Sequence, residues 1–336
     1  MTLRLTGDAE RDTDAVAEWL DARDPGPVVV ATSGSSGSPK QVVLRREAVL
    51  ASADASAARV GGTGPWLLAL PSSYVAGLNV VVRSLLAGHR PVVLGDRAPR
   101  QAGLAGGYLS LVPTQLHRWL DHPADVEVLA AVDTVLIGGG PIDPALRARA
   151  DGAGITLVAT YGMAETCGGC VYDGLPLDGV GLALAEDGRV RLTGPMLFEG
   201  YLDDPVATDE VLVDGWFVSG DAGRLDEDGR LQVVGRVDDM VVSGGVNVPA
   251  AAVAARLREH PRVEAAEVVG VADEEWGNRV VAVVVGSVAL EEARDWVSAR
   301  HPRAWAPRQV VVVPALPMLG NGKPDRLAVR AVAEGA

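Results

Sequence analysis

The sequence contains few cysteines, and this scarcity limits the chemistry available to its sulfur atoms. The two cysteines, Cys167 and Cys170, fit a chain that works in a reducing cytoplasm. Their C-x-x-C spacing permits a redox or a zinc interpretation. A structural zinc ion needs about four ligands, however, and the sequence has no second cysteine pair. We therefore expect these thiols to pack in the core or to line a pocket.

Positive charge and long apolar runs are also scarce. The chain has 44 acidic and 30 basic residues, and its net charge of -14 argues against a nucleic-acid partner. Its longest apolar runs, such as residues 280–285, are too short to span a bilayer, and residues 1–4 do not begin a secretory signal. We therefore expect a cytoplasmic protein without membrane insertion. Its 336 residues exceed one ordinary core and suit two or three domains.

Lysine is rare among the basic residues, because Lys40 and Lys323 are the only two lysines of the sequence. The chain carries arginine wherever either residue would serve. A compact ammonium group fits beside a phosphate at places where a planar guanidinium group does not. We therefore treat both lysines as candidates for phosphate contacts.

Strand-like and helix-like segments alternate from residue 27 to about residue 200. This alternation predicts a large α/β domain of layered sheets with helices. After about residue 240 the pattern restarts, with strand-like segments at 263–271 and 279–285, and predicts a small α+β domain. We place an N-terminal domain at residues 1–236, a hinge at 237–239 and a C-terminal domain at 240–336.

A loop rich in serine and glycine follows the first predicted strand of the large domain. Its members are Thr32, Ser33, Gly34, Ser35, Ser36, Gly37, Ser38, Pro39 and Lys40. Glycine permits the positive φ angles that turn backbone N–H groups toward an anion, and Lys40 adds a positive charge. The loop therefore predicts phosphate binding, although it lacks the G-x-x-x-x-G-K-(S/T) pattern of nucleoside triphosphatases. A plain Ser/Gly linker is the alternative.

Further segments offer groups that suit a nucleotide. Segment 161–166 supplies the Tyr161 ring to cover a base and the Glu165 carboxylate to hold Mg²⁺. The three glycines at 138–140 let a flat ligand approach the backbone. In segment 215–221, Asp221 is suited to accept hydrogen bonds from a ribose, with a Gly-Asp turn as the alternative.

In their order along the chain, these segments resemble the acyl-adenylate-forming superfamily of acyl-CoA synthetases and adenylation domains. Residues 32–40 match (S/T)-S-G-(S/T)-(S/T)-G-x-P-K, and Gln41 replaces the glycine that usually follows. Residues 161–165 match Y-G-x-(T/S)-E, with alanine in place of the hydroxyl residue, and residues 215–221 match G-W-(F/Y)-x-(T/S)-G-D. Residues 235–239 match the hinge motif G-R-x-D-D, and residues 316–323 match L-P-x-x-x-x-G-K. The resemblance covers residues 28–326.

The resemblance implies a two-step ligation that uses ATP, Mg²⁺ and coenzyme A, with Lys323 and Glu165 as catalytic residues and Glu165 as the metal ligand. It implies a C-terminal domain that rotates about the hinge. The residues that it assigns to ATP or AMP are Thr32, Ser33, Gly34, Ser35, Ser36, Gly37, Lys40, Gly138, Gly139, Tyr161, Gly162, Asp221 and Arg236. Those that it assigns to coenzyme A and the hinge are Asp238, Ser243, Gly244 and Gly245.

The acid is suggested by a second resemblance. Three features resemble the actinobacterial o-succinylbenzoate–CoA ligases of menaquinone biosynthesis. They are the short segment before the Ser/Gly loop, the sequence Y-V-A-G-L at 74–78 and the sequence E-T-C-G-G-C at 165–170. Arg83 lies in the apolar run 78–86, where a buried guanidinium group needs an anion. o-Succinylbenzoate has one carboxylate to activate and a second for Arg83 to bind. We expect Tyr74, Arg83, Gly139 and Gly140 to line the acyl pocket. The alternative for Arg83 is a position on the helix surface or a structural ion pair.

Other functions share these motifs. Another aryl- or acyl-CoA ligase would use the same chemistry on a different acid. A stand-alone adenylation enzyme that loads a carrier protein is the next alternative, although this chain shows neither a carrier domain nor the expected amino-acid-anchoring aspartate. A non-catalytic nucleotide-binding relative is the third. The expected partners are a small carboxylic acid and coenzyme A, and the formation of a homodimer stays open.

Overall fold

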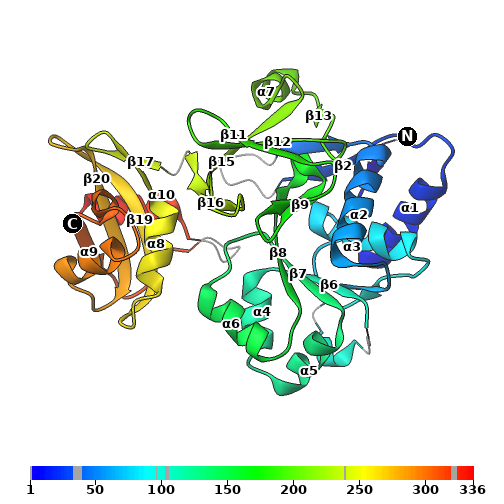
Figure 1. The fold of residues 1–336 in the computed structure, drawn as a ribbon, viewed down its shortest axis with the longest axis horizontal. Helices are drawn as coiled ribbons and strands as arrows, with labels where there is room; N and C mark the ends of the chain where they lie inside the picture. Colours follow the sequence, from blue (N-terminus) through cyan, green and yellow to red (C-terminus); the bar gives the residue numbers. More distant parts are fainter. Residues whose placement is uncertain (1, 33–39, 96, 103–105, 238–239, 319–323) are drawn as a thin grey trace. The chain divides into compact units, whose positions relative to one another are not determined.

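The computed structural model describes residues 2–32, 40–95, 97–102, 106–237, 240–318 and 324–336. The chain divides into two compact units (Figure 1). The first comprises Met1–Ala183, Arg191–Ser219 and Leu225–Leu231, and the second comprises Leu184–Val190, Gly220–Arg224 and Gln232–Ala336. The domain bounds and the hinge given above stay a prediction, because residues 238–239 lie outside the described residues.

A seven-stranded sheet organises the first unit. Its strands, in spatial order, are β10 (Leu175–Pro176), β9 (Gly168–Tyr172), β8 (Leu157–Met163), β7 (Thr134–Ile137), β6 (Tyr108–Leu111), β4 (Trp66–Leu68) and β5 (Val92–Val93). The strands from β5 to β8 pair in parallel, whereas β9 pairs antiparallel with β8 and with β10. Parallel strands are usually covered on both faces, which explains the fully buried Leu67, Leu109 and Val135.

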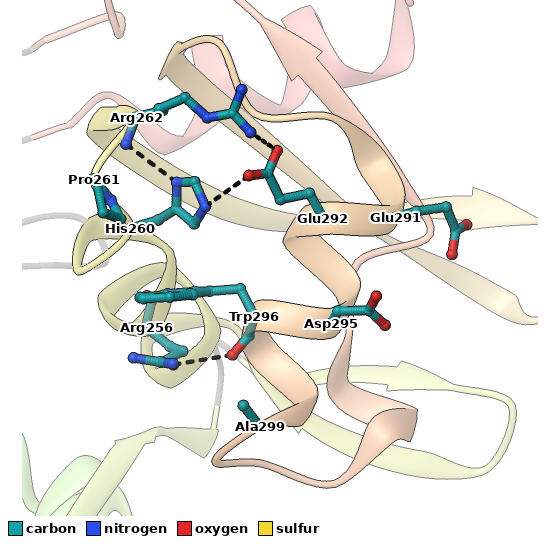
Figure 2. Close-up of a pocket in the computed structure, with 9 residues that line it drawn as sticks. All are labelled: Arg256, His260, Pro261, Arg262, Glu291, Glu292, Asp295, Trp296 and Ala299. Atoms are coloured by element: carbon teal, nitrogen blue, oxygen red, sulfur yellow. Dashed lines mark hydrogen bonds and ion pairs between the residues drawn. The ribbon is translucent and has the colours of Figure 1, made fainter.

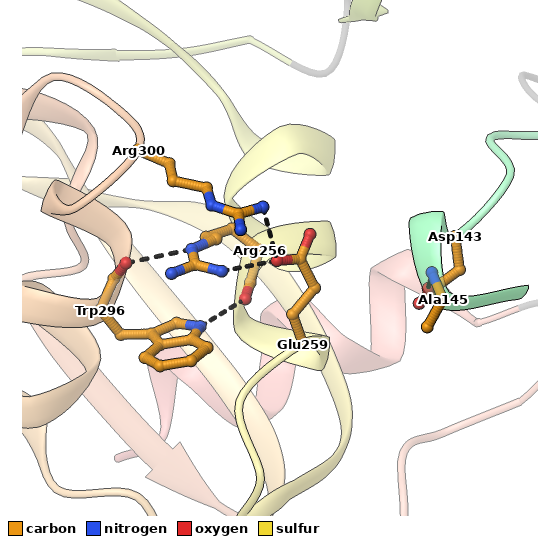
Figure 3. Close-up of polar contacts among 6 residues, drawn as sticks. All are labelled: Asp143, Ala145, Arg256, Glu259, Trp296 and Arg300. Carbon is orange, nitrogen blue, oxygen red and sulfur yellow. Dashed lines mark hydrogen bonds and ion pairs between the residues drawn. The ribbon is translucent and has the colours of Figure 1, made fainter. Parts of the chain in front are cut away.

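Helices cover this sheet on both sides. They are α2 (Arg46–Val60), α3 (Val75–Leu86), α4 (Pro113–Trp119), α5 (Pro123–Ala131) and α6 (Pro144–Gly152). Figure 1 shows α2 and α3 on one side of the strands and α4 and α6 on the other. Leu116 and Trp119 of α4, Leu129 of α5 and Leu146 of α6 pack in one apolar cluster with strand residues. Asp143 caps the N-terminus of α6, and its carboxylate accepts a hydrogen bond from the Ala145 N–H group at 2.7 Å (Figure 3).

The other described strands before residue 237 form two smaller sheets. The first has the order β1 (Leu3–Arg4), β2 (Val28–Ala31), β3 (Gln41–Leu44) and β13 (Gly200–Tyr201). The second has the order β11 (Gly181–Leu184), β12 (Arg189–Thr193), β15 (Trp216–Leu225) and β14 (Leu212–Val213), and β16 (Leu231–Arg236) also pairs with β15. Helices α1 (Ala9–Asp21) and α7 (Pro205–Val211) are also part of the first unit.

Two details differ from the sequence-based expectations. The strand expected at 156–159 continues to Met163, because after Ala159 it pairs with β9 instead of β7. Tyr161 and Gly162 therefore lie in a strand. Asp221 also lies in a strand, within β15, so the alternative of a Gly-Asp turn was wrong.

The C-terminal part of the second unit contains a three-stranded sheet and a two-stranded hairpin. Its elements are the hairpin β17 (Met240–Ser243) and β18 (Val246–Pro249), α8 (Ala250–Arg258), β19 (Val263–Asp273), β20 (Gly277–Gly286), α9 (Leu290–Ser298), β21 (Gln309–Val312) and α10 (Arg326–Glu334). The three-stranded sheet has the order β19-β20-β21. Alternate residues of β20 face opposite sides of the sheet. Val280 and Val284 pack in one cluster with α8 and α9, whereas Val281 and Val283 pack in another with Val329 of α10. This two-sided core explains the nearly unbroken run of valines.

The fold class expected from the sequence is confirmed by the first unit's mixed sheets and helices and by the solved structures reported below. Across the described ranges, no helix combines the length and the apolar character needed to cross a membrane.

Candidate active site

The two ends of the Ser/Gly loop are held together. The Thr32 N–H group donates to the Lys40 carbonyl at 2.9 Å, and the Lys40 N–H group donates to the Thr32 hydroxyl at 3.0 Å. These bonds extend the pairing of β2 with β3 by one step. The remaining candidates of this loop, Ser33, Gly34, Ser35, Ser36 and Gly37, lie outside the described residues.

Glu165 lies in the 3-10 helix η2 (Ala164–Thr166), which follows β8. Its side chain is 9% exposed, and its Oε1 atom accepts a hydrogen bond from the Tyr201 hydroxyl at 2.8 Å. Within the described ranges, no cationic side chain forms an ion pair with this carboxylate. A buried carboxylate whose donor is a neutral hydroxyl group has no counter-ion of its own among these residues, and carboxylate oxygens are the ligands that a hard divalent cation prefers.

Lys40 and Glu165 contact the same tyrosine. The Lys40 Nζ atom lies 4.3 Å from the centre of the Tyr201 ring, a cation–π contact. The structure thus brings together the lysine of the predicted phosphate loop and the carboxylate of the predicted metal site. Sequence reasoning missed Tyr201. The signal for it is that a buried tyrosine needs a partner for its hydroxyl group.

The glycines at the ends of β7 and β8 are required by close contacts. A Cβ atom on Gly138 would lie 2.5 Å from the Thr160 hydroxyl, and one on Gly162 would collide with the Gly168 carbonyl. Gly139 has a φ of +77°, a conformation that strongly favours glycine. At Gly140 a Cβ atom would meet open space. The backbone beyond β7 is therefore accessible at Gly140, and small residues are obligatory beside it.

Tyr161 presents its ring from β8, and its hydroxyl bonds to Ser219 at 3.4 Å. Tyr74 is the residue before α3, and its side chain is 44% exposed. An exposed aromatic side chain at a helix start is available to a ligand. The predicted roles of Tyr74 and Tyr161 stay proposals.

Arg83 is buried in α3, with 8% of its surface exposed. Its guanidinium group lies 5.3 Å from the Trp66 ring centre and donates weakly to the Tyr172 hydroxyl at 3.5 Å. The Tyr172 hydroxyl is 2.8 Å from the Ser56 hydroxyl. No carboxylate of the described residues pairs with Arg83, and its buried Nε atom has no hydrogen-bond partner. The alternative of a structural ion pair therefore has no support among these residues.

The turn after Glu165 is fixed by donors from two helices. Cys167 has a φ of +50°, and its carbonyl accepts hydrogen bonds from Asn79 at 2.7 Å and Ser52 at 3.1 Å. The thiols of Cys167 and Cys170 are free and buried. Burial raises the pKa of Cys170 to about 12 and raises that of Cys167 further. Both thiols are therefore neutral packing groups, as expected from the sequence.

The ribose candidates lie in the second unit and pair with each other. The Arg236 guanidinium group is 3.7 Å from the Asp221 carboxylate. A Cβ atom on Gly220 would lie 2.5 Å from the same guanidinium group. Burial lowers the pKa of Arg326, and the charges of Arg236 and Arg330 lower it further. Arg236 thus lies between the Asp221 carboxylate, with which it pairs, and a second guanidinium group whose pKa its charge lowers.

The candidates for coenzyme A lie in the β17–β18 hairpin. Gly244 has a φ of +57°, and its N–H group donates to the Trp276 carbonyl at 2.9 Å. A Cβ atom there would lie 2.8 Å from the Trp276 ring, so glycine is required. Ser243 is buried and its hydroxyl group has no hydrogen-bond partner. A Cβ atom added at Gly245 would meet open space. The hinge candidate Asp238 and the catalytic candidate Lys323 lie outside the described residues.

A groove of about 950 Å³ lies beside α8 and α9 in the second unit (Figure 2). His260 donates from Nε2 to Glu292 at 3.2 Å, while its Nδ1 atom accepts from the Arg262 N–H group at 3.2 Å. Glu292 also pairs with the Arg262 side chain. The hydrogen bond from Arg262 is the largest cause that lowers the pKa of Glu292. The polar groups on this wall of the groove therefore bind one another.

The Glu259 carboxylate is paired in the same way (Figure 3). Its Oε2 atom accepts from Arg256 at 2.5 Å and from Arg300 at 3.4 Å. Arg256 also donates to the Trp296 carbonyl at 3.1 Å and lies 4.0 Å from the centre of the Trp296 ring. This saturated network joins α8 to α9 and carries no sign of a catalytic role.

The comparisons with known proteins decide the family. The model of the AMP-binding enzyme family matches residues 4–202, and that of the AMP-binding enzyme C-terminal domain matches residues 252–323. This chain belongs to the AMP-binding enzyme family. The resemblance to acyl-adenylate-forming enzymes is thereby confirmed.

Several relatives of this AMP-binding enzyme carry a more specific name. It is 44% identical over 331 residues to the probable 2-succinylbenzoate–CoA ligase of Mycobacterium tuberculosis, covering 94% of this chain and 86% of that relative. It is 33% identical to the 2-succinylbenzoate–CoA ligase of Listeria monocytogenes, covering 89% of this chain and 68% of that relative.

Solved structures of AMP-binding enzymes share the fold. The o-succinylbenzoate CoA synthetase from Bacillus subtilis, solved with its acyl-adenylate intermediate, matches with a TM-score of 0.79 at 28% identity, covering 90% of this chain and 68% of that chain. The same Bacillus enzyme has been solved with ATP and a magnesium ion. An amide bond synthetase from Marinactinospora thermotolerans matches with a TM-score of 0.79 at 30% identity, covering 91% and 69% of the two chains.

Proposed function

We propose that this AMP-binding enzyme is an o-succinylbenzoate–CoA ligase of menaquinone biosynthesis, working in the cytoplasm. The named relatives support this function. The observation that carries it is Arg83, a buried guanidinium group without a carboxylate partner among the described residues. A substrate with a second carboxylate would supply the missing anion, and such an ion pair binds strongly in a buried site.

The ligation takes place in two steps that conserve all atoms. The substrate carboxylate attacks the α-phosphorus of ATP, which gives acyl-AMP and pyrophosphate. The thiol of coenzyme A then attacks the acyl carbon, releasing AMP and a proton. The first step brings two anions together, so positioned cations and N–H groups must offset negative charge at the α-phosphate.

The first unit supplies the proposed phosphate and acyl contacts. Glu165 would hold Mg²⁺, which when bound would offset negative charge on the phosphate oxygens. Thr32, Lys40 and the loop between them would bind the β- and γ-phosphates. Tyr161, Gly138, Gly139 and Gly162 would border the nucleotide, and Tyr74, Gly139 and Gly140 would border the acyl group next to Arg83.

The second unit supplies the remaining proposed contacts. Asp221 and Arg236 would bind the ribose, and Lys323 would contact the carboxylate and the α-phosphate. Rotation about Asp238 would then withdraw Lys323 and present Ser243, Gly244 and Gly245 to coenzyme A. Gly244 and Gly245 carry no side chain that would obstruct a narrow thiol-bearing chain.

Exchange of labelled pyrophosphate into ATP tests the function. We expect exchange with o-succinylbenzoate and little with benzoate or medium-chain acids, which lack the second carboxylate. Exchange with another acid alone would favour a different CoA ligase. Exchange without transfer to coenzyme A would favour an enzyme that loads a carrier protein, and no exchange with any acid would favour a non-catalytic relative.

The role of Lys323 needs a separate experiment, because two half-reactions are involved. The Lys323→Ala variant should lose adenylation by about 10²–10³ in rate, the usual loss when one positioned donor is removed. It should still convert supplied acyl-AMP and coenzyme A to the thioester. Equal losses in both half-reactions would refute the proposed role.

A further inference from the structure

We infer that Tyr201 is a positioning residue for the adenylation step, since its hydroxyl holds the Glu165 carboxylate while its ring supports the Lys40 ammonium group. One side chain thus contacts both charged groups that the proposed function assigns to the metal and the phosphates. This inference rests on the proposed function, because it assumes that Glu165 and Lys40 act on ATP and Mg²⁺.

The hydrogen bond to Glu165 orients the carboxylate without neutralising it. The Tyr201 hydroxyl donates to Oε1 at 2.8 Å, and Tyr201 itself is 8% exposed. A cationic donor at this place would compete with Mg²⁺ for the carboxylate. A neutral phenol fixes the rotamer of Glu165 and leaves its negative charge available to the metal.

The contact with Lys40 acts on the opposite charge. The ring face attracts the ammonium group, whose Nζ atom is 4.3 Å from the ring centre. A direct ion pair between Lys40 and Glu165 would cancel both charges, and none is present between these two described residues. The phenol ring therefore holds the cation while leaving its charge available to a phosphate.

The backbone places Tyr201 next to the lysine. Tyr201 pairs with Val42 across β13 and β3, and the next N–H group, that of Leu202, donates to the Gln41 carbonyl at 2.8 Å. The Tyr201 N–H group donates to the Thr208 hydroxyl at 2.9 Å. The ring is also packed edge-to-face against Phe198, with 5.2 Å between ring centres. Tyr201 is thus fixed by backbone and ring contacts, as a positioning residue must be.

Two substitutions separate the contacts. Tyr201→Phe removes the hydroxyl and keeps the ring, whereas Tyr201→Leu removes both. We would measure ATP binding by calorimetry at a series of Mg²⁺ concentrations without any acid, so that no turnover occurs. In Tyr201→Phe, the Mg²⁺ concentration for half-maximal ATP binding should rise about tenfold, because one hydrogen bond to a charged group is lost. Tyr201→Leu should in addition weaken ATP binding at saturating Mg²⁺ by about threefold.

A double-mutant cycle shows whether Tyr201 acts through Glu165. In a Glu165→Gln background, Tyr201→Phe should change the Mg²⁺ dependence by less than about twofold. The matched control is Tyr108→Phe, which removes the hydroxyl of another buried tyrosine stacked on Trp66 and should bind Mg²⁺ and ATP like the wild type. If Tyr201→Leu does not fold, Tyr201→Phe still tests the hydroxyl, and Lys40→Met should reproduce the threefold loss at saturating Mg²⁺.

Unchanged Mg²⁺ dependence in a folded Tyr201→Phe variant would overturn the inference, as would a full tenfold effect in the Glu165→Gln background. Failure of the proposed function gives a different result. In that case the wild type itself either does not bind ATP with Mg²⁺ or shows no exchange with o-succinylbenzoate.

Discussion

In the second unit, the Glu259 carboxylate is paired with two guanidinium groups, and the Glu292 carboxylate is paired with the Arg262 guanidinium group and with the His260 imidazole. In the first unit, Arg83 and Glu165 are more deeply buried, yet across the described ranges neither has a partner of opposite charge. Each is contacted instead by a tyrosine hydroxyl, that of Tyr172 or that of Tyr201. A buried charge without a counter-ion costs folding free energy, so its retention is a sign of a ligand.

The difference does not come from the first unit as a whole. Its other buried carboxylates are fully bonded, as Asp12 is by Thr6, Gly7 and Ser72, and Asp125 is by Arg100. Asp12 has no cationic partner either, but its carboxylate accepts four hydrogen bonds. Among the described buried charges of the first unit, Glu165 and Arg83 are each hydrogen-bonded to a single tyrosine hydroxyl. The sign of each unpaired charge then predicts its ligand, a cation for Glu165 and an anion for Arg83.

The largest effect should follow from removing the negative charge at Glu165. Glu165→Gln keeps an acceptor for Tyr201 but cannot attract a divalent cation, so pyrophosphate exchange should fall by about 10²–10³. The matched control is Glu199→Gln, which removes an exposed carboxylate paired with Arg45 at 2.7 Å. Exposed pairs contribute little, so the control should stay within about twofold. Equal losses in both variants would contradict the proposed difference between the unpaired Glu165 and a paired surface carboxylate.

Removing the positive charge at Arg83 should have two opposite effects. Arg83→Met should raise the KM for o-succinylbenzoate by about 10–100-fold, with the KM for ATP unchanged. It should also raise the melting temperature of the ligand-free protein, because an unpaired buried charge is lost. Arg90→Met is the control, since Arg90 is exposed and paired with Glu10 and Asp14. An unchanged KM for the acid in Arg83→Met would argue against the second-carboxylate assignment.

The paired charges should behave in the reverse way. Glu259→Gln removes the partner of the buried Arg256 guanidinium group and should destabilise the second unit by about 1–3 kcal/mol in chemical unfolding. Pyrophosphate exchange at temperatures well below the transition should not change. Glu264→Gln, at an exposed position, provides the control. Loss of pyrophosphate exchange without loss of stability would show that the Glu259 network has a role in the reaction.

Acid should weaken the second unit through Glu292. The Arg262 hydrogen bond lowers the pKa of Glu292 in the folded state below its usual value of 4.5. The contribution of this carboxylate to stability is therefore complete above pH 4.5 and is lost as the pH falls through the folded-state pKa. Melting temperatures measured from pH 6 downward (~0.5-unit steps, since the effect is spread over a few units) should fall less steeply in Glu292→Gln. The same slope as in Glu291→Gln would contradict this assignment.

The smallest effect concerns the thiols near Arg83 and Glu165. With a pKa of about 12 for Cys170 and a higher one for Cys167, both are protonated and buried at neutral pH. Iodoacetamide should leave the native protein unmodified, and both thiols should react after denaturation, as read by mass spectrometry. Rapid labelling of the native protein would contradict the burial of these thiols.

The fold class, many strands and the ligand-binding motifs could be predicted from the sequence, because they depend on local periodicity and loop composition. The valine run of β20 and the helical pattern of α3 are examples. The partners of Glu165 and Arg83 could not be predicted. Tyr201 lies 36 positions from Glu165, and Tyr172 lies 89 positions from Arg83, so both contacts depend on strand pairing. Helix α10 was not among the elements predicted from the sequence.

The pairing of β3 with β13 affects how the protein is made. Residues 41–44 are synthesised before β13 at residues 200–201, which completes their sheet only after the long segment between them has been synthesised. Lys40 and Glu165 therefore acquire their common tyrosine late, because contacts between distant segments must wait for both. Until then the incomplete sheet has an open edge at β3, the place where a nascent chain would most need protection from wrong pairing.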